Sequence, residues 1–388
     1  MKLGLKGISD QVVVITGGSS GIGLATAILA ARKGAKVVLN SRDEADLRSA
    51  VEQIEAEGGD AIYHVGDVAD PQAMSALGGR AVSRYGRIDT WVNNAGVSTY
   101  GRIEEVSLED ARRIFDTNYW GVVHGSLAAL PHLRLEGGAL INVGSILSST
   151  GYPLQGHYTA SKHAVKGFTD SLRIELEESA LPVSVTLIQP AAVDTPYPAH
   201  AKSYLGVEPK HLPPVYAPEV VAEAIVHCAQ RPERNVLVGG AGKLFSGMEK
   251  YAPRLGDVMK EKAAFAGQYS EYPDRGTDTL HAPWPGDGRV HASYPGRVLQ
   301  LSLYTRARLN RSATILGRTV LGAGLALASR VGRSGGNEAR RNDRHRARAG
   351  DPYGGRFPER RGDRLPRPSG TGERTGSPCP SRYIPRLH

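Results

Sequence analysis

Seven short runs rich in β-branched residues alternate with segments of helical periodicity over the first 245 residues, and this alternation restricts the possible folds. The predicted strands are QVVVITGG (11–18), AKVVLNS (35–41), DAIYHVGDV (60–68), IDTWVNNAG (88–96), GALINVGS (138–145), LPVSVTLIQP (181–190) and RNVLVGG (234–240). Helices are predicted at 21–34, 44–59, 71–86, 107–134, 158–179 and 217–230. Strands that alternate with helices of this length predict a parallel sheet covered on both faces, a doubly wound α/β fold. Ligands of such sheets bind beyond the carboxyl ends of the strands.

The first strand ends in the glycine-rich turn TGGSSGIG, residues 16–23. Gly17, Gly21 and Gly23 allow a tight turn and a backbone pressed against a pyrophosphate. The helix that opens after Ser20 directs its N–H groups and positive dipole end at those phosphates. Because the turn follows a strand and opens a helix, it predicts a dinucleotide-binding Rossmann fold rather than a plain loop.

The second strand ends in Asn40 and Ser41, followed by Arg42. A dinucleotide fold places here either an acid for the adenosine ribose 2′-OH or an arginine for a 2′-phosphate. Arg42 would bind that phosphate and predicts NADP(H), with NAD(H) as the alternative. Asp43 directly afterwards keeps open the other interpretation, in which Arg42 is a solvated loop residue.

The third and fourth strands also end in polar residues. Asp67 and Val68 are predicted to hold the adenine, while Asp70 caps the helix that begins at Pro71. The fourth strand ends in NNAG, a turn that lets backbone approach the ribose. For Asn93 and Asn94, a structural role in this turn and direct ligand contact are both open.

Ser145 ends the fifth strand, and Tyr158 and Lys162 follow four residues apart in a helical segment, so the latter two share one helix face. A free phenol has a pKa near 10 and is a poor base at neutral pH. A cation about 4 Å away, at an effective dielectric near 20, is worth roughly 4 kcal/mol, or about three pKa units. We therefore expect Lys162 to bring the phenol near pH 7, where it exchanges protons while Ser145 holds the substrate oxygen. The arrangement predicts a hydride-transfer site.

With these residues in place, residues 8–245 resemble the short-chain dehydrogenase/reductase family. The resemblance is carried by TGGSSGIG, NNAG, the Asn118 of DTNYWG, Ser145 and YTASK. It implies a catalytic tetrad of Asn118, Ser145, Tyr158 and Lys162. In it Lys162 also binds the nicotinamide ribose and Asn118 holds a proton-relay water. The same resemblance implies that Val193 and Thr195 touch the cofactor carboxamide. The family usually has Pro-Gly where this chain has Pro190-Ala191, which places a methyl group near the nicotinamide.

The expected cofactor-binding residues, taken together, are Gly17, Ser19, Ser20, Gly21, Ile22, Gly23, Arg42, Asp67, Val68, Asn94, Ala95, Gly96, Tyr158, Lys162, Val193 and Thr195. No metal site is expected, because the 12 histidines and two cysteines show no ligand spacing.

Three regions are expected: a catalytic domain (1–250), a helical C-terminal extension (251–330) and a disordered Arg/Gly/Pro-rich tail (331–388). Within the domain, residues 196–216 correspond to the family's substrate lid. Its Tyr197, Tyr204 and Tyr216 either line an apolar pocket or pack the loop down.

The net charge of +9 is unevenly distributed. Residues 1–262 carry 26 basic and 29 acidic side chains, whereas residues 331–388 carry 14 and 6. The tail is either an unstructured basic arm or a translated out-of-frame end, and it lacks the interleaved aromatics of a nucleic-acid arm. The apolar run 312–329 is too short to span a membrane. It is either a surface helix in weak membrane contact or a packing helix.

These features predict an NADP(H)-dependent oxidoreductase that interconverts a small-molecule alcohol and a carbonyl. The family implies a homodimer or homotetramer, and no nucleic-acid partner is expected. The short apolar run near the N-terminus is not a signal peptide, so a cytoplasmic location is expected, with peripheral membrane contact as an option. The alternative is a non-catalytic dinucleotide-binding scaffold or sensor that acts through its basic tail. The complete tetrad argues against it, since a scaffold has no need of a tuned phenol.

Overall fold

The computed structural model describes residues 3–240, 251–284, 286, 288–292 and 294–309, all within one compact unit, Met1–Thr319. The predicted segment 312–329 and the predicted tail 331–388 lie outside the described residues.

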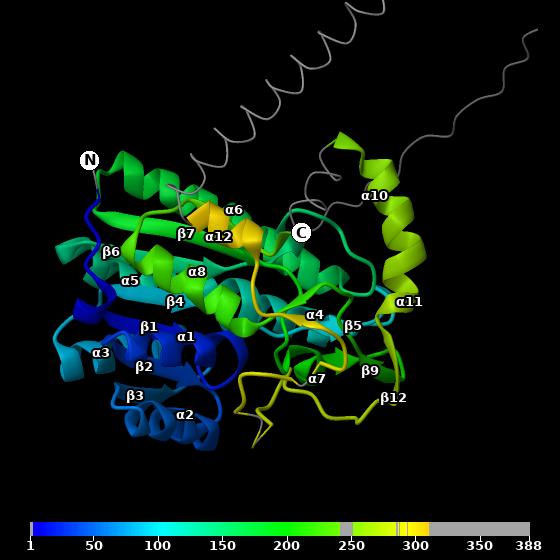
Figure 1. Ribbon diagram of the computed structural model, residues 1–388, viewed down its shortest axis with the longest axis horizontal. Coiled ribbons are helices and arrows are strands. Elements are labelled where there is room, and N and C mark those ends of the chain that lie inside the picture. Colours follow the sequence, from blue (N-terminus) through cyan, green and yellow to red (C-terminus); the bar gives the residue numbers. More distant parts are fainter. Residues whose placement is uncertain (1–2, 241–250, 285, 287, 293, 310–388) are drawn as a thin grey trace, which may run out of the picture. The chain divides into compact units, whose positions relative to one another are not determined.

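A seven-stranded, all-parallel sheet forms the centre of the described unit (Figure 1). Its strands, in spatial order, are β11 (Asn235–Val238), β7 (Val183–Pro190), β6 (Gly138–Val143), β4 (Thr90–Asn93), β1 (Val12–Thr16), β2 (Lys36–Ser41) and β3 (Asp60–Val65). The chain reverses its direction of winding between β1 and β4, so the strand ends beside β1 form the ligand-binding crevice of this fold. The doubly wound α/β prediction is confirmed.

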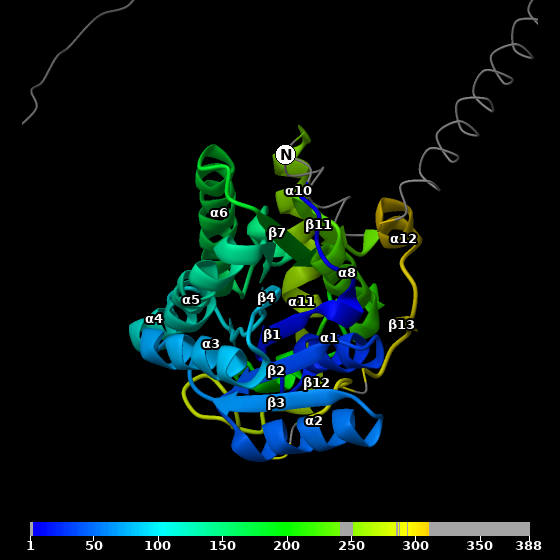
Figure 2. The same ribbon diagram turned by 90° about the vertical axis from the view of Figure 1, so that its left-hand side faces the viewer.

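Helices cover both faces of the sheet (Figure 2). One face carries α1 (Gly21–Arg32), α2 (Glu44–Ala56) and α8 (Pro218–Gln230), and the other carries α3 (Pro71–Tyr85), α5 (Gly121–Glu136) and α6 (Gly156–Glu178). Strand side chains alternate between the two resulting cores: Ile15 packs on the first face and Val14 on the second. All five residues of β1 are buried, as expected of a strand covered on both sides.

The helix predicted at 107–134 is interrupted. It consists of α4 (Leu108–Phe115), a π-helical turn (Asp116–Trp120) and α5. At the end of the turn, the Gly121 N–H donates to the Asp116 carbonyl, five residues earlier. Such turns are commonly found at functional sites, and this one contains Asn118.

The lid and the described part of the extension are joined by short strands. In the lid, α7 (Tyr197–His200) is followed by β8 (Lys202–Ser203), β9 (Val207–Pro209) and β10 (Val215–Tyr216), and β8 pairs with β5 (Thr99–Tyr100). The extension contains α10 (Pro253–Met259), a π turn (Lys260–Ala264), α11 (Phe265–Gly267), β12 (Tyr269–Pro273), β13 (Val298–Leu299) and α12 (Leu303–Leu309). Strand β12 pairs with β9, and β13 pairs with β10. The extension is therefore built onto the lid (Figure 1).

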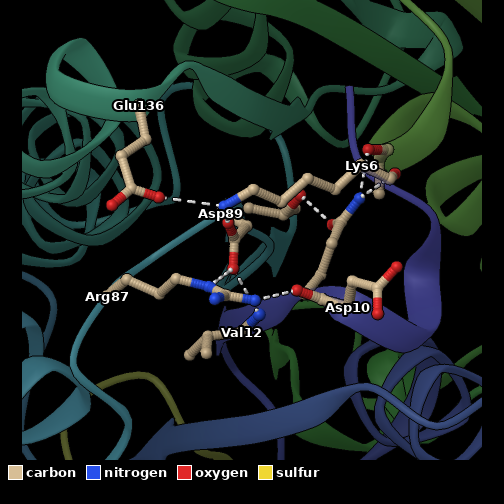
Figure 3. A network of polar contacts seen from close by, with 9 residues as sticks. Lys6, Asp10, Val12, Arg87, Asp89 and Glu136 are labelled. Atoms are coloured by element: carbon tan, nitrogen blue, oxygen red, sulfur yellow. Dashed lines mark hydrogen bonds and ion pairs between the residues drawn. The ribbon is translucent and has the colours of Figure 1, made fainter. Parts of the chain in front are cut away.

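A network of charged groups closes the amino-terminal edge of the sheet (Figure 3). The buried Asp89 carboxylate accepts from Lys6 Nζ at 2.7 Å, Arg87 Nε at 2.9 Å and the Val12 N–H at 2.8 Å. Lys6 also reaches Glu136 at 3.0 Å. Lys6 precedes β1 and Val12 begins it, Arg87 and Asp89 precede β4, and Glu136 ends α5. The network therefore ties the N-terminal segment to the sheet.

Candidate active site

The glycine-rich turn between β1 and α1 leaves no room for side chains at two of its glycines. Gly17 has φ +63°, and a Cβ there would lie 2.8 Å from the Ala95 Cα atom. A Cβ on Gly23 would lie 1.9 Å from the Gly17 carbonyl oxygen, so the start of α1 packs directly on the turn. This is the close backbone packing that a pyrophosphate-binding turn requires, with the first N–H groups of α1 at its edge.

The turn after β4 holds the glycine-rich turn in place. Asn94 Nδ2 donates to the carbonyl oxygens of Thr16 and Gly17, both at 3.0 Å. In return, the N–H groups of Asn94 and Ala95 donate to Thr16 Oγ1. Asn93 instead is buried and accepts from Trp91 Nε1 at 2.8 Å. The structural role left open for this pair is therefore present, and Asn94 in addition lines the ligand crevice.

Two adjoining cavities follow the carboxyl-terminal edge of the sheet, and both include Gly17, Ser20, Ala95 and Gly96. The main cavity, of about 310 Å³, brings together the expected residues Gly21, Ile22, Asn94, Ser145, Tyr158, Lys162, Val193 and Thr195. The smaller one, of about 120 Å³, adds Ser19, Arg42, Asp67 and Val68. Of the predicted site residues, Gly23 and Asn118 line neither cavity, because Gly23 packs on Gly17 and Asn118 lies behind the turn after β4.

Two buried polar atoms of the smaller cavity have no hydrogen-bond partner among the described residues. They are Asn40 Oδ1 and Thr117 Oγ1. Burying an unpaired polar atom costs free energy, so a site with two of them suits a ligand that supplies hydrogen bonds. The adenosine half of a nicotinamide dinucleotide carries hydrogen-bonding groups of this kind.

Charged residues on either side of the smaller cavity are already engaged. Asp67 pairs with Arg113 at 2.5 Å and accepts from the Ala69 N–H at 3.0 Å. Burial opposes ionisation of Asp67, but these two partners outweigh it and keep the Asp67 pKa below its ordinary value. Arg42 is half-buried and donates to carbonyl oxygens of the extension, those of Thr279, Leu280 and His281. Arg42 is therefore not the solvated loop residue of the alternative interpretation.

Tyr158, Lys162 and Ser145 meet in the main cavity, and all three are buried. Tyr158 and Lys162 lie one turn apart on α6. Ser145 caps a short 3₁₀ turn, where its Oγ accepts from the Leu147 N–H at 3.1 Å. This bond occupies an acceptor site and leaves the hydroxyl proton to donate elsewhere.

Asn118 adjoins this trio without entering the cavity. Its amide clamps the backbone of Val97, accepting from the N–H at 2.8 Å and donating to the carbonyl at 3.0 Å. It also donates to Ser161 Oγ on α6 at 3.0 Å. A Cβ built on Gly96 would lie 3.4 Å from Asn118 Oδ1 and 3.6 Å from Lys162 Nζ, which places all three groups together. The role of Asn118 in holding a water stays a prediction.

The electrostatics of the Tyr158–Lys162 pair differ from the sequence expectation. Burial raises the pKa of Tyr158, and the nearby hydroxyls of Tyr197 and Ser145 only partly offset this. Lys162 Nζ lies 5.7 Å from the Tyr158 ring centroid and donates to the Val143 carbonyl at 3.0 Å, while burial lowers the Lys162 pKa to about 8. The expected depression of the phenol pKa is wrong for this geometry, because desolvation outweighs the attraction of a cation directed at a backbone carbonyl.

The three lid tyrosines have different roles. Tyr197 lines the main cavity and stacks on His211, with ring centroids 6.0 Å apart and planes 4° apart. Burial lowers the pKa of His211 to about 4, so this ring is neutral at physiological pH. Tyr204 instead donates its hydroxyl to Asp110, and Tyr216 accepts from the Gly240 N–H at 3.1 Å. These two pack the lid down.

Several cavity residues had no signal in the sequence. Tyr100 and Tyr152 complete an aromatic wall, and burial raises the pKa of Tyr152 to about 12. Lys210 comes from the lid, and Lys260 and Gln268 come from the extension. No motif marks these positions, and contacts between distant segments, the pairing of β12 with β9 among them, bring the extension to the site.

Ala191, the departure from the family's Pro-Gly, lines the main cavity as expected. A Cβ built on Gly239 would lie 2.9 Å from its methyl group, so Ala191 also packs against the end of β11. Among the described residues, no helix has the length and apolar character needed to cross a membrane.

Comparisons with known proteins show which family the chain resembles. The family model for short chain dehydrogenases matches residues 11–204. The chain is 46% identical to the uncharacterized oxidoreductase YxnA of Bacillus subtilis over 275 residues, 70% of this chain and 77% of that protein. It is 32% identical to the putative oxidoreductase SadH of Mycobacterium tuberculosis over 243 residues, 61% of this chain and 88% of that protein.

Two solved structures share the fold. One is a short chain dehydrogenase/reductase from Burkholderia phymatum in complex with NAD, with a TM-score of 0.57 and 27% identity over 63% of this chain and 94% of that one. The other is an alcohol dehydrogenase from Thermococcus sibiricus complexed with 5-hydroxy-NADP, with a TM-score of 0.52 and 27% identity over 59% of this chain and 95% of that one.

Proposed function

The chain belongs to the short-chain dehydrogenase/reductase family, an oxidoreductase family, and on that premise we propose that it interconverts a small-molecule alcohol and a carbonyl with NADP(H). Tyr158 is the proton donor and acceptor. The observation that carries the proposal is the convergence of Ser145, Tyr158 and Lys162 in one cavity beside the glycine-rich turn.

Each of the three residues has a role that follows from its contacts. The Ser145 hydroxyl, whose oxygen is fixed by the Leu147 N–H, donates to the substrate oxygen. Tyr158 gives that oxygen a proton in reduction and removes it in oxidation. Lys162 supplies a buried positive charge and a donor for the cofactor ribose. The bound nicotinamide supplies or accepts the hydride.

Without a bound cofactor, the raised pKa of Tyr158 favours reduction, because the protonated phenol is the form that can donate a proton to the substrate oxygen. The positive charge of an oxidised nicotinamide favours the phenolate and so supports the reverse reaction.

The preference for NADP(H) is supported by the end of β2. Arg42 lines the smaller cavity, and the two preceding residues, Asn40 and Ser41, carry no negative charge that would repel a 2′-phosphate. The guanidinium has five N–H donors, so a phosphate and the carbonyl oxygens of the extension compete for or share them.

A homodimer or homotetramer is part of the same proposal. Three large apolar side chains are exposed on neighbouring helices or just before them: Trp120 (47%), Leu127 on α5 (59%) and Ile174 on α6 (58%). Light scattering on the wild type and on Leu127→Glu tests whether they are covered by a second copy. A cytoplasmic location stays a prediction of the sequence.

The experiment that tests the activity is a panel of ketones, aldehydes and secondary alcohols, followed by nicotinamide absorbance with NADPH and NADH in parallel. We expect turnover of at least one carbonyl compound with NADPH and a lower KM for NADPH than for NADH. A wild type that prefers NADH would overturn the role of Arg42 and leave the reaction class standing. Turnover that is equally fast with Tyr158→Phe would overturn the reaction assignment.

A further inference from the structure

The charged side chains that line the main cavity all have the same sign. Among the described residues they are Lys162, Lys210 and Lys260, and no aspartate or glutamate lines the wall. Lys162 belongs to the catalytic group. The other two come from the lid and the extension, outside the part of the chain that the family model matches.

Contacts place Lys260 beside the segment that carries Ser145 and Tyr158. Its side chain is 9% exposed, and its Nζ donates to Thr150 Oγ1 at 3.2 Å. Asp257, one turn earlier, lies 3.2 Å away but is itself 54% exposed. Water therefore partly screens this carboxylate.

Gln268 brings Lys210 to the same segment. The Lys210 N–H donates to the Gln268 carbonyl at 3.0 Å. The buried Gln268 side chain accepts from Gln155 Nε2 at 2.8 Å and donates to the Pro153 carbonyl at 3.1 Å. Lys260 thus bonds directly to residues 150–155, the loop between Ser145 and Tyr158, and the backbone of Lys210 is linked to this loop through Gln268.

The rest of the wall here is apolar and aromatic. It is formed by Tyr100, Leu147, Tyr152, Tyr197 and Leu212. A wall of this kind accommodates a hydrocarbon body, and the ammonium group of the buried Lys260 attracts an anion strongly because little water screens it. The cofactor's phosphates do not account for these lysines, since the glycine-rich turn and the start of α1 supply that site.

We propose that the substrate is an oxo or hydroxy compound with an apolar body and a carboxylate, and that Lys210 and Lys260 bind the carboxylate. This inference rests on the proposed function and specifies its substrate class. The two lysines are specificity-determining residues: they hold the far end of the substrate while its carbonyl faces Ser145 and Tyr158.

The test measures binding and turnover separately. The NADPH-saturated full-length protein is titrated by calorimetry with straight-chain carboxylates of four to ten carbons and with the amide of each. In parallel, the methyl-ketone acids of the same lengths and their methyl esters are assayed as substrates. We expect at least one carboxylate to bind about tenfold or more tightly than its amide, and the matching oxo acid to have the higher kcat/KM.

Variants assign the effect to the two lysines. Lys210→Met and Lys260→Met should each reduce the carboxylate preference to less than about threefold, and Lys210→Glu should reverse it. Lys166→Met is the matched control, because Lys166 lies on α6, pairs with Asp170 and does not line the cavity. Melting temperatures identify any variant that fails to fold. Because Lys210 is half-buried, its replacement should not unfold the protein. The Lys210 variants therefore still test the proposal if Lys260→Met fails to fold.

Two results would overturn the inference: no carboxylate binding more than about threefold tighter than its amide, or a preference that persists in the Lys210→Met/Lys260→Met double variant. In either case, turnover of neutral ketones would leave the proposed function intact. Carboxylate binding that depends on both lysines, without turnover of any carbonyl compound, would instead retain the anion site and overturn the proposed function.

Discussion

At the amino-terminal edge of the sheet, the buried Asp89 carboxylate has two cations and a backbone N–H as partners. At the carboxyl-terminal edge, Asn40 Oδ1 and Thr117 Oγ1 are buried with no hydrogen-bond partner among the described residues. Lys162 there has a pKa lowered to about 8, held by one backbone carbonyl.

The same sheet thus pairs its buried carboxylate fully at one edge and leaves two buried polar atoms without a partner among the described residues at the other. Satisfied groups contribute to the free energy of unfolding, whereas unsatisfied ones reduce it and create a place for a ligand. The comparison predicts that variants at the two edges affect different quantities: stability at the amino-terminal edge, and binding or turnover at the carboxyl-terminal edge.

The largest expected effect is on turnover. Tyr158→Phe removes the exchangeable proton and should lower kcat by about 10²- to 10⁴-fold, since general acid–base groups contribute this much. Cofactor affinity and melting temperature should stay close to wild type. The matched control is Tyr216→Phe, which removes a lid hydroxyl outside the cavity and should keep its activity. More than a few per cent of activity in Tyr158→Phe would exclude this residue as the acid/base.

At the opposite edge, Asp89→Ala should destabilise the fold without touching the chemistry. It leaves the Val12 N–H without its acceptor and removes the shared partner of Lys6 and Arg87, for a loss of about 2–4 kcal/mol in the free energy of unfolding.

Urea unfolding and kcat/KM, measured on the same preparation, check the Asp89 prediction. Glu57→Ala is the control, because its partner Arg32 is 59% exposed and a pair of this kind contributes little. If kcat/KM of Asp89→Ala falls by more than its fraction of folded protein, the amino-terminal edge also affects turnover, and the proposed division between the two edges is wrong.

Arg42→Asp tests the adenosine side of the carboxyl-terminal edge. It exchanges attraction for repulsion at a 2′-phosphate, so the NADPH KM should rise about 10- to 150-fold and the preference should shift toward NADH. Arg42 also holds carbonyl oxygens of the extension, so NADH kinetics serve as the internal control. An equal rise in both KM values would mean that Arg42 acts by holding the extension and not by binding phosphate.

The pH profile of reduction tests Lys162 with a smaller effect. The Lys162 side chain is positively charged below its pKa of about 8, and it loses its proton and its charge as the pH rises through that value. Tyr158, whose pKa is raised, stays protonated over the same range. We expect kcat/KM for carbonyl reduction to be level from about pH 6 to 7.5 and to fall above about 8. In Lys162→Arg, which keeps its charge, the fall should move to higher pH; an unchanged profile would assign it to another group.

The smallest expected effect is that of removing the tail, residues 331–388. Every motif on which the site depends lies before residue 200, and residues 331–388 have too few apolar side chains to offset their ordering entropy. A chain that stops after Arg330 should match the full-length protein in melting temperature and kcat/KM. A drop of several degrees, or a tenfold loss of activity, would show that the tail packs on the catalytic part.

The sequence by itself determined the strands of the central sheet and the candidate catalytic trio. Strand and helix periodicities depend on neighbouring residues, so the seven strands of the sheet could be predicted from local pattern. The positions of Ser145, Tyr158 and Lys162 followed in the same way, because parallel strands deliver their carboxyl ends to one edge. The glycine-rich turn could be predicted equally well, since close backbone packing admits only glycine at positions such as 17 and 23.

Only the tertiary structure decided how these residues are surrounded. Desolvation depends on atoms from distant segments, so the raised pKa of Tyr158 could not be read from its spacing to Lys162. The π turn at Asn118 interrupts a helix whose local pattern is continuous. Lys210 of the lid and Lys260 of the extension line one cavity, and the pairing of β9 with β12 joins these two segments. Pairing between distant strands is a property of the folded chain, and for that reason this part of the cavity wall could not be predicted from the sequence.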